Sequence, residues 1–106
     1  MICRVWRGWT TPGNAAPYQS VLLDGVIPAI EARRIPGFHQ IDILRLDRGE
    51  EVEFTTVMWF DSIDSVRNFM GADYTLSHVP AEARVVLAHF DAHAEHLEVV
   101  DRRPQM

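Results

Sequence analysis

The chain has 106 residues, 47% of them hydrophobic, which fits a single domain with a core of its own. Its formal charge of −5 argues against a nucleic-acid-binding protein, because neutralising phosphates requires a basic surface. All 10 basic residues are arginine, and this excludes Schiff-base chemistry and a lysine-anchored pyridoxal cofactor.

The first half of the chain predicts a strand, a long helix and a second strand. Ile2–Trp9 is rich in strand formers, and Ala15–Arg33 carries an apolar stripe at helical spacing. Pro28 lies deep inside this helix, so we expect a kink or an end of the regular part near Gly25–Ile27. Phe38–Arg48 predicts the second strand.

The segment Val52–Phe69 begins as a run of strand formers and changes to helical periodicity at Asp61-Ser62. Alternation divides the strand into two faces, with Phe54, Thr56, Met58 and Phe60 on one and Thr55, Val57 and Trp59 on the other. Both faces are largely apolar, so we expect both to be covered. Asp61 or Ser62 can cap the helix, which Gly71 should end.

The last third of the chain predicts a loop, a short helix and an edge strand. These are Ala72–Val79, Pro80–Leu87 and Glu95–Val100. Residues 1–101 then form the domain and residues 102–106 a frayed tail. The order β-α-β-β-α-(short α)-β predicts an α+β fold, a ferredoxin-like βαββαβ sandwich with two helices on one face of four strands.

The sheet face away from the helices is also predicted to be apolar. Its candidate residues are Val5, Ile41 or Leu44, Val57 and Leu97. A soluble monomer rarely exposes an apolar face of this size. We therefore expect a homodimer in which two sheets face each other and close into a dimeric α/β barrel.

The single Cys3 cannot form an intrachain disulfide, which favours a reducing compartment. The first residues lack the apolar region of a signal peptide, and no apolar run approaches membrane-spanning length. We expect a cytoplasmic protein with neither a membrane nor a nucleic acid as partner.

Four parts of the chain together resemble the antibiotic biosynthesis monooxygenase-like superfamily. They are the strand-to-helix segment Trp59–Phe69, the opening Ile2–Gly8, the Pro36-Gly37 turn and the final strand Glu95–Val100. The resemblance covers nearly the whole chain and implies a dimeric α/β barrel. Members that look alike at this level include cofactor-free quinol oxygenases, haem-degrading enzymes and proteins with no assigned reaction.

In the oxygenases that the chain resembles, a Trp at the position of Trp59 lines a pocket between sheet and helices. There it helps to hold an aromatic substrate whose anion passes an electron to dioxygen. The resemblance thus implies Trp59 as a substrate-binding residue, with Phe54 and Phe69 as further apolar walls. The alternative for Trp59 is a core aromatic that stabilises the sheet.

Such chemistry also needs polar groups that orient the substrate and accept its proton. By chain order the candidates are His39, Tyr74 and His78 as catalytic residues and Arg84 as a substrate-binding residue. Arg4 and Arg7 on the first strand differ in facing direction, and one of them is a further candidate for anchoring an acidic substrate. The alternative is a salt bridge with a glutamate of a neighbouring strand, Glu53 or Glu98.

No metal and no other cofactor is expected. Haem-degrading members share an Asn on the first strand, a Trp on the third strand and a His on the second helix. Of these three residues only the Trp is present in this chain, as Trp59. His89, His93 and His96 would need a continuous helix to share a face, and the strand expected near Glu95 interrupts it. His96 itself can form a hydrogen bond across the sheet or at the dimer interface, or act in catalysis.

The sequence thus leads to a cofactor-independent monooxygenase acting on an aromatic or polyketide-like small molecule. A non-catalytic dimeric protein that binds small molecules or is associated with stress is the first alternative. A structural dimer with a filled core is the second.

Overall fold

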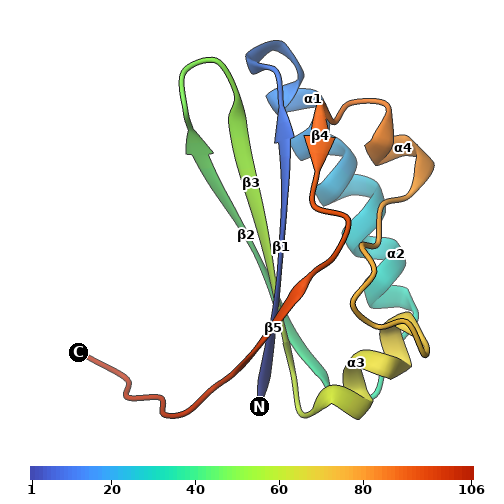
Figure 1. Cartoon of the computed structure of the whole chain (residues 1–106), viewed down its shortest axis with the longest axis vertical. Helices are drawn as coiled ribbons and strands as arrows, with labels where there is room; N and C mark the ends of the chain where they lie inside the picture. Colours follow the sequence, from blue (N-terminus) through green and yellow to red (C-terminus); the bar gives the residue numbers. More distant parts are fainter.

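The computed structural model describes residues 1–106 as one antiparallel sheet with helices packed on one of its faces (Figure 1). In chain order the elements are β1 (Ile2–Thr10), a 3₁₀ turn (Pro12–Asn14), α1 (Ala15–Val21), a π-helical turn (Leu22–Val26), α2 (Ile27–Ala32), β2 (Phe38–Asp47), β3 (Val52–Phe60), α3 (Ile63–Met70), α4 (Ala81–Arg84), β4 (His89–Phe90) and β5 (Glu95–Glu98). None of these helices has the length and apolar character needed to cross a bilayer.

The strand order is β2-β3-β1, and both β4 and β5 then pair with β1. In the centre of the sheet Val5 of β1 lies opposite Val57 of β3, and all pairs are antiparallel. The ferredoxin-like sandwich predicted from the sequence is confirmed. The predicted count of four strands is wrong, because the two-residue β4 occupies the end of β1 that β5 does not reach.

The long first helix is interrupted where the sequence predicts an irregularity. The backbone N–H of Ile27 donates to the carbonyl of Leu22, five residues earlier, which defines the π-helical turn. Pro28 follows directly. It has no N–H, and its ring would collide with the carbonyl of Asp24 in a regular α-helix, so the wider turn relieves that clash.

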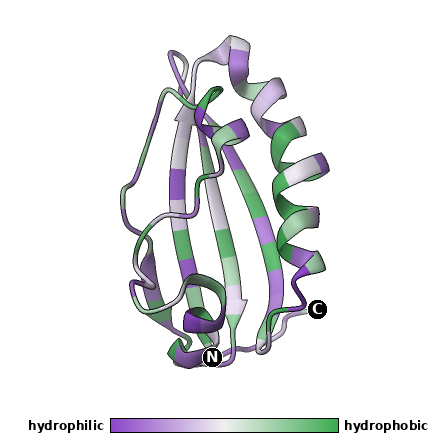
Figure 2. Ribbon diagram, turned by 90° about the vertical axis from the view of Figure 1, so that its right-hand side faces the viewer, coloured by the Kyte–Doolittle hydropathy of each residue, from purple (hydrophilic) through white to green (hydrophobic).

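The core lies between the helices and the inner face of the sheet. Its largest fully buried side chains include Tyr18 of α1, Phe54 and Phe60 of β3 and Val66 of α3. In Figure 2 the hydrophobic residues of the long helix follow the side that is turned to the sheet. Ser62 caps α3 by accepting the backbone N–H of Ser65, so of the two predicted caps Ser62 is the correct one.

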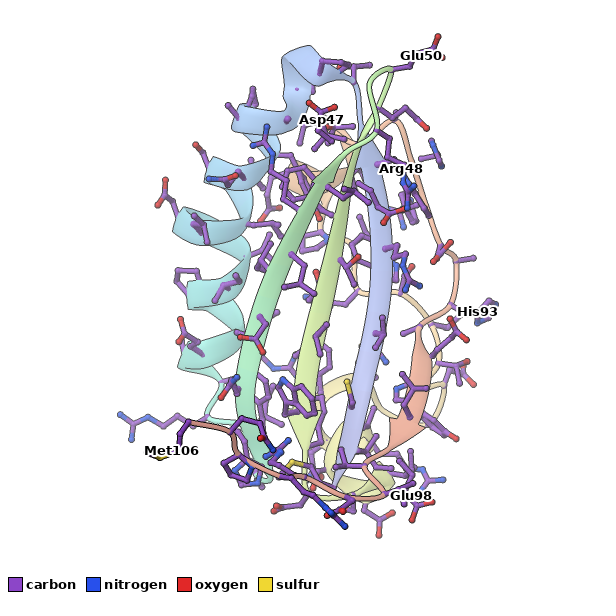
Figure 3. All side chains as sticks on the ribbon, turned by 90° about the vertical axis from the view of Figure 1, so that its left-hand side faces the viewer. Asp47, Arg48, Glu50, His93, Glu98 and Met106 are labelled. Carbon is purple, nitrogen blue, oxygen red and sulfur yellow. The ribbon has the colours of Figure 1, made fainter.

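No helix covers the outer face of the sheet, which faces the viewer in Figure 3. Leu44 and Leu97 project from this face and are 53% and 52% exposed, while Val57 at its centre is nearly buried. Ile41 pairs with Met58 on the inner face, so Leu44 is the correct one of the two alternatives. The C-terminal tail crosses one end of the outer face (Figures 1 and 3).

Candidate functional site

A cavity of about 40 Å³ lies between the sheet and the helices. Twelve of its sixteen lining residues are hydrophobic, and they come from all three long strands, from the first helix and its π-helical turn, from α3 and from the segment around α4. The apolar walls include Val26, Ile30, Ile43, Met58 and Phe69. An apolar cavity with a few convergent polar groups is the usual form of a small-molecule site.

Arg4 of β1 is the charged residue of the cavity and is only 3% exposed. Its Nη1 donates to the carbonyl of Tyr74 (2.5 Å) and to Nε2 of His96 (3.1 Å), and its Nη2 donates to the carbonyl of Leu76 (2.7 Å). Burial lowers the pKa of Arg4 to about 10. The guanidinium therefore stays charged at neutral pH inside an apolar site.

No carboxylate lies within 4.0 Å of the Arg4 guanidinium. The salt bridge predicted for Arg4 or Arg7 with Glu53 or Glu98 is wrong. Arg4 points to the helix side of the sheet, away from Glu53, and Arg7 lies 3.9 Å from Glu95 instead. Glu53 on the outer face accepts hydrogen bonds from Trp9 and Arg48 instead.

His78 lies at the mouth of the cavity, where its ring packs against Phe69 with 5.1 Å between the ring centroids. The pKa of His78 is lowered, mainly by burial and further by the positive charges of Arg33 and Arg4, while Glu82 acts in the opposite direction. The imidazole is therefore neutral at pH 7. Neither ring nitrogen has a hydrogen-bond partner in the protein, so one lone pair is free to accept a proton.

Tyr18 of α1 lines the same cavity and is 1% exposed. Its ring meets Phe54 edge-on, with 4.9 Å between centroids. Burial raises the pKa of Tyr18, so the phenol stays protonated and can donate. Its hydroxyl has no hydrogen-bond partner in the protein, but the oxygen itself is not fully enclosed.

His96 of β5 lies beside Arg4 on the neighbouring strand, and its hydrogen bond to Nη1 orients the guanidinium. Burial, and secondly the charge of Arg4, lower the pKa of His96 to about 4. Its neutral Nε2 accepts the Arg4 hydrogen bond, which places the ring proton on Nδ1. Of the alternatives for His96, the structure shows the hydrogen bond across the sheet.

Three solved structures superpose on nearly the whole chain. A Bacillus cereus protein assigned as an antibiotic biosynthesis monooxygenase has a TM-score of 0.65 at 12% identity, over 98% of this chain and 97% of that one. The haem-degrader MhuD of Mycobacterium tuberculosis, whose structure holds two hemes in its active site, has a TM-score of 0.61 at 20% identity, over 98% and 100%. SnoaB, a cofactor-independent oxygenase from Streptomyces nogalater, has a TM-score of 0.52 at 21% identity, over 97% and 94%.

The chain has the antibiotic biosynthesis monooxygenase fold. At these identities the likeness establishes the fold and leaves the reaction open. No protein-family model and no curated protein sequence matches the chain.

Three of the residues predicted from the sequence line the cavity, namely Arg4, His78 and Phe69. Phe54 is fully buried and contacts the ring of Tyr18, so it supports the wall from behind. Tyr74 contributes through its backbone carbonyl, which holds Arg4, while its ring packs edge-on against His96.

Trp59 does not line the cavity, and the position predicted for it is wrong. It lies on the outer face of the sheet, where its indole N–H donates to Oδ2 of Asp42 (2.9 Å) and the guanidinium of Arg102 stacks on its ring. The cause is the alternation of the strand: Phe60, one residue later, takes the inner position and is fully buried. Trp59 and Phe54 therefore cannot share one pocket.

His39 and Arg84 also lie outside the cavity. His39 sits at an irregularity of β2, exposed, and pairs with Asp61. Arg84 stacks on Phe90 and donates from Nε to the carbonyl of Val79. Neither is among the residues that line the cavity.

Two cavity residues with hydroxyl groups were absent from the predicted site. Tyr18 carries the only hydroxyl on the apolar stripe of the first helix, and Thr56 lies on the inner face of β3. For Tyr18 a signal existed, since a phenol among aliphatic residues at helical spacing turns its ring toward the core.

The residues present do not fit the haem site of the degrading members, because Trp59 points away from the cavity and α3 carries no histidine. The three histidines near the C-terminus do not converge either. His89 pairs with Glu51, His93 contacts Thr75, and His96 accepts from Arg4.

Proposed function

We propose that the protein is a cofactor-independent monooxygenase that acts on an aromatic or polyketide-like small molecule in this cavity. The observation that carries the proposal is His78, an exposed imidazole that lines an apolar cavity and has no hydrogen-bond partner in the protein. Its lowered pKa favours the neutral form. A general base needs this state at neutral pH. The description of SnoaB as a cofactor-independent oxygenase supports the reaction class.

In this mechanism His78 accepts a proton from the substrate, and the resulting anion passes an electron to dioxygen. When a ring CH₂ group becomes C=O, one oxygen atom enters the substrate and the other leaves as water. No external electron donor is required. Phe69 and the aliphatic walls hold the ring and keep bulk water from the anion.

The cavity must widen to admit such a substrate, since pockets for small molecules typically measure roughly 300–1,000 Å³. The segment around Leu76 is tied down by backbone hydrogen bonds from Ser77 to Ala92 and from Ala94 to Thr75. The opposite wall contains the π-helical turn, whose backbone bonds are less regular. We therefore assign the widening to the helix side and to side chains at the mouth.

We also propose that two copies of the chain pair through the outer faces of their sheets. Leu44, Leu46 and Leu97 project from this face with about half of their surface exposed. Val57 and Cys3 join them as an apolar centre. A second copy would cover these side chains symmetrically, as the dimeric barrel requires.

Oxygen consumption with a panel of hydroquinones and anthrone-like phenols tests the proposed reaction. His78→Ala should lower kcat/KM by roughly 100- to 10,000-fold, the usual contribution of a general base. His39→Ala is the matched control, because this histidine is exposed and lies outside the cavity. Equal losses in the two variants, or full turnover by His78→Ala, would refute the proposal. If ligands bind and none is oxidised, the non-catalytic alternative gains.

A further inference from the structure

The guanidinium of Arg4 has donors that the protein does not use. A guanidinium carries five N–H groups, and only three of them have acceptors here: the carbonyls of Tyr74 and Leu76 and the Nε2 of His96. The Nε–H and one Nη2–H have none. In arginine Nε and Nη2 form one edge, and this edge commonly binds two oxygens of an anion side by side.

The charge of Arg4 is likewise uncompensated. All three acceptors are neutral, and no carboxylate lies within 4.0 Å. A second cation, Arg33, also lies over the Phe69 ring, 5.2 Å from its centroid, with Arg4 at 5.5 Å. Arg33 also donates only to backbone carbonyls. Burying a cation without a counter-charge is costly, so proteins rarely retain one without a use for it.

The cavity around Arg4 sets the shape of a fitting ligand. Arg4 is opposite Met58 on the inner face of the sheet, and the aromatic rings of Phe69 and His78 lie beside it. Further along β3, Tyr18 places its unpartnered phenol next to Phe54. A ligand therefore meets a cation and an aromatic wall at one end and a neutral donor at the other.

We infer that Arg4 is the receptor for a planar oxyanion, so that the cavity binds its substrate as an aromatic carboxylate or as a phenolate or enolate. This inference rests on the proposed function, because it concerns the same cavity. As a phenolate receptor, Arg4 stabilises the anion that forms when His78 removes the proton. As a carboxylate receptor, it anchors a group that takes no part in the reaction.

Two pairs of probes that differ in charge and little in shape test the inference on the unmodified protein. Benzoate should bind at least about tenfold more tightly than benzamide, a difference that one good charged contact readily supplies. 4-Nitrophenol should bind with its ionisation shifted toward the yellow anion by a factor of about ten, whereas 4-nitroanisole reports binding without charge. The benzoate preference alone identifies a carboxylate anchor, and the shifted nitrophenol identifies a phenolate or enolate site.

Two variants assign the effect to Arg4. Arg4→Met should abolish both effects, while Arg4→Lys, which keeps the charge but not the two-pronged edge, should retain part of them. Arg33→Met is the matched control, because Arg33 stacks on the same ring but does not line the cavity, and it should keep the preference. If Arg4→Met does not fold, the charged and neutral probe pairs on the wild-type protein decide the question.

The inference is overturned if wild-type protein binds benzamide as tightly as benzoate and leaves the ionisation of 4-nitrophenol unchanged. It is also overturned if Arg4→Met keeps the preference. An Arg4-dependent preference without any oxygen consumption refutes the proposed reaction and leaves the anion site standing. If oxygen consumption depends on His78 but the protein binds charged and neutral probes equally well, the anion site is refuted and the proposed reaction stands.

Discussion

Replacing single leucines on the outer face of the sheet should weaken the expected dimer. Leu44 and Leu97 are 53% and 52% exposed. Full burial of a leucine side chain contributes about 1.5–3 kcal/mol, so covering the remaining half contributes about 1 kcal/mol. Each position occurs twice in a symmetric dimer, and removal therefore costs about 2 kcal/mol, or roughly a 30-fold weaker Kd. Leu44→Asp or Leu97→Asp should cost more, because each carboxylate also loses water.

The matched control is Leu23→Asp. Leu23 is 51% exposed but lies on the first helix, away from the outer face. Sedimentation velocity over a range of micromolar concentrations measures the association of all three variants. The reasoning fails if the wild-type chain sediments as a monomer throughout, or if Leu23→Asp weakens association as much as the two sheet variants.

Three further predictions concern pH and backbone conformation. Because the pKa of His78 lies below its usual 6.5, turnover should fall only at pH values below 6.5. Arg33→Gln removes a cation that lowers this pKa, so the acidic limb of the kcat/KM profile should move to higher pH. An unchanged limb would contradict this. His96 has a pKa of about 4 when folded against 6.5 in the unfolded chain, so the unfolded state takes up the proton first and the urea midpoint should drop between these pH values. His96→Gln should flatten that drop. Gly37→Ala should lower the free energy of unfolding by more than the ~1–2 kcal/mol expected for Gly49→Ala. Both glycines have positive φ, but only at Gly37 would a Cβ overlap a neighbouring side chain, and equal thermal shifts would refute this.

Most of the fold followed from local patterns in the sequence. The strand Val52–Phe60 and its Ser62-capped helix carry their periodicity and capping chemistry within the segment itself, so their bounds were predicted closely. Pro28 likewise marked the irregular turn in the first helix. The strand β4 escaped prediction because two residues are too few to show alternation.

The candidate site was harder to predict because it depends on long-range register. The contact of Arg4 with His96 requires the pairing of β1 with β5, which no local pattern encodes. For Trp59 the sequence assigned the two faces of β3 correctly, but the family resemblance put Trp59 in one pocket with Phe54, which lies on the opposite face. The alternation of side chains along the strand decides which way Trp59 points, and it overrides the resemblance.

The π-helical turn at Leu22–Val26 holds one more residue than an α-helix would need to cover the same rise. Gly25 within it is surrounded by open space, so the backbone tolerates change there. Deleting one residue from this turn would restore a regular α-helix and leave Ile30 on its present face, because the wider turn absorbs the extra residue without changing the phase of the helix. Pro28 would then lose the wider turn that accommodates its ring. The extra residue thus lets the helix carry a proline while the side chains after it keep facing the cavity.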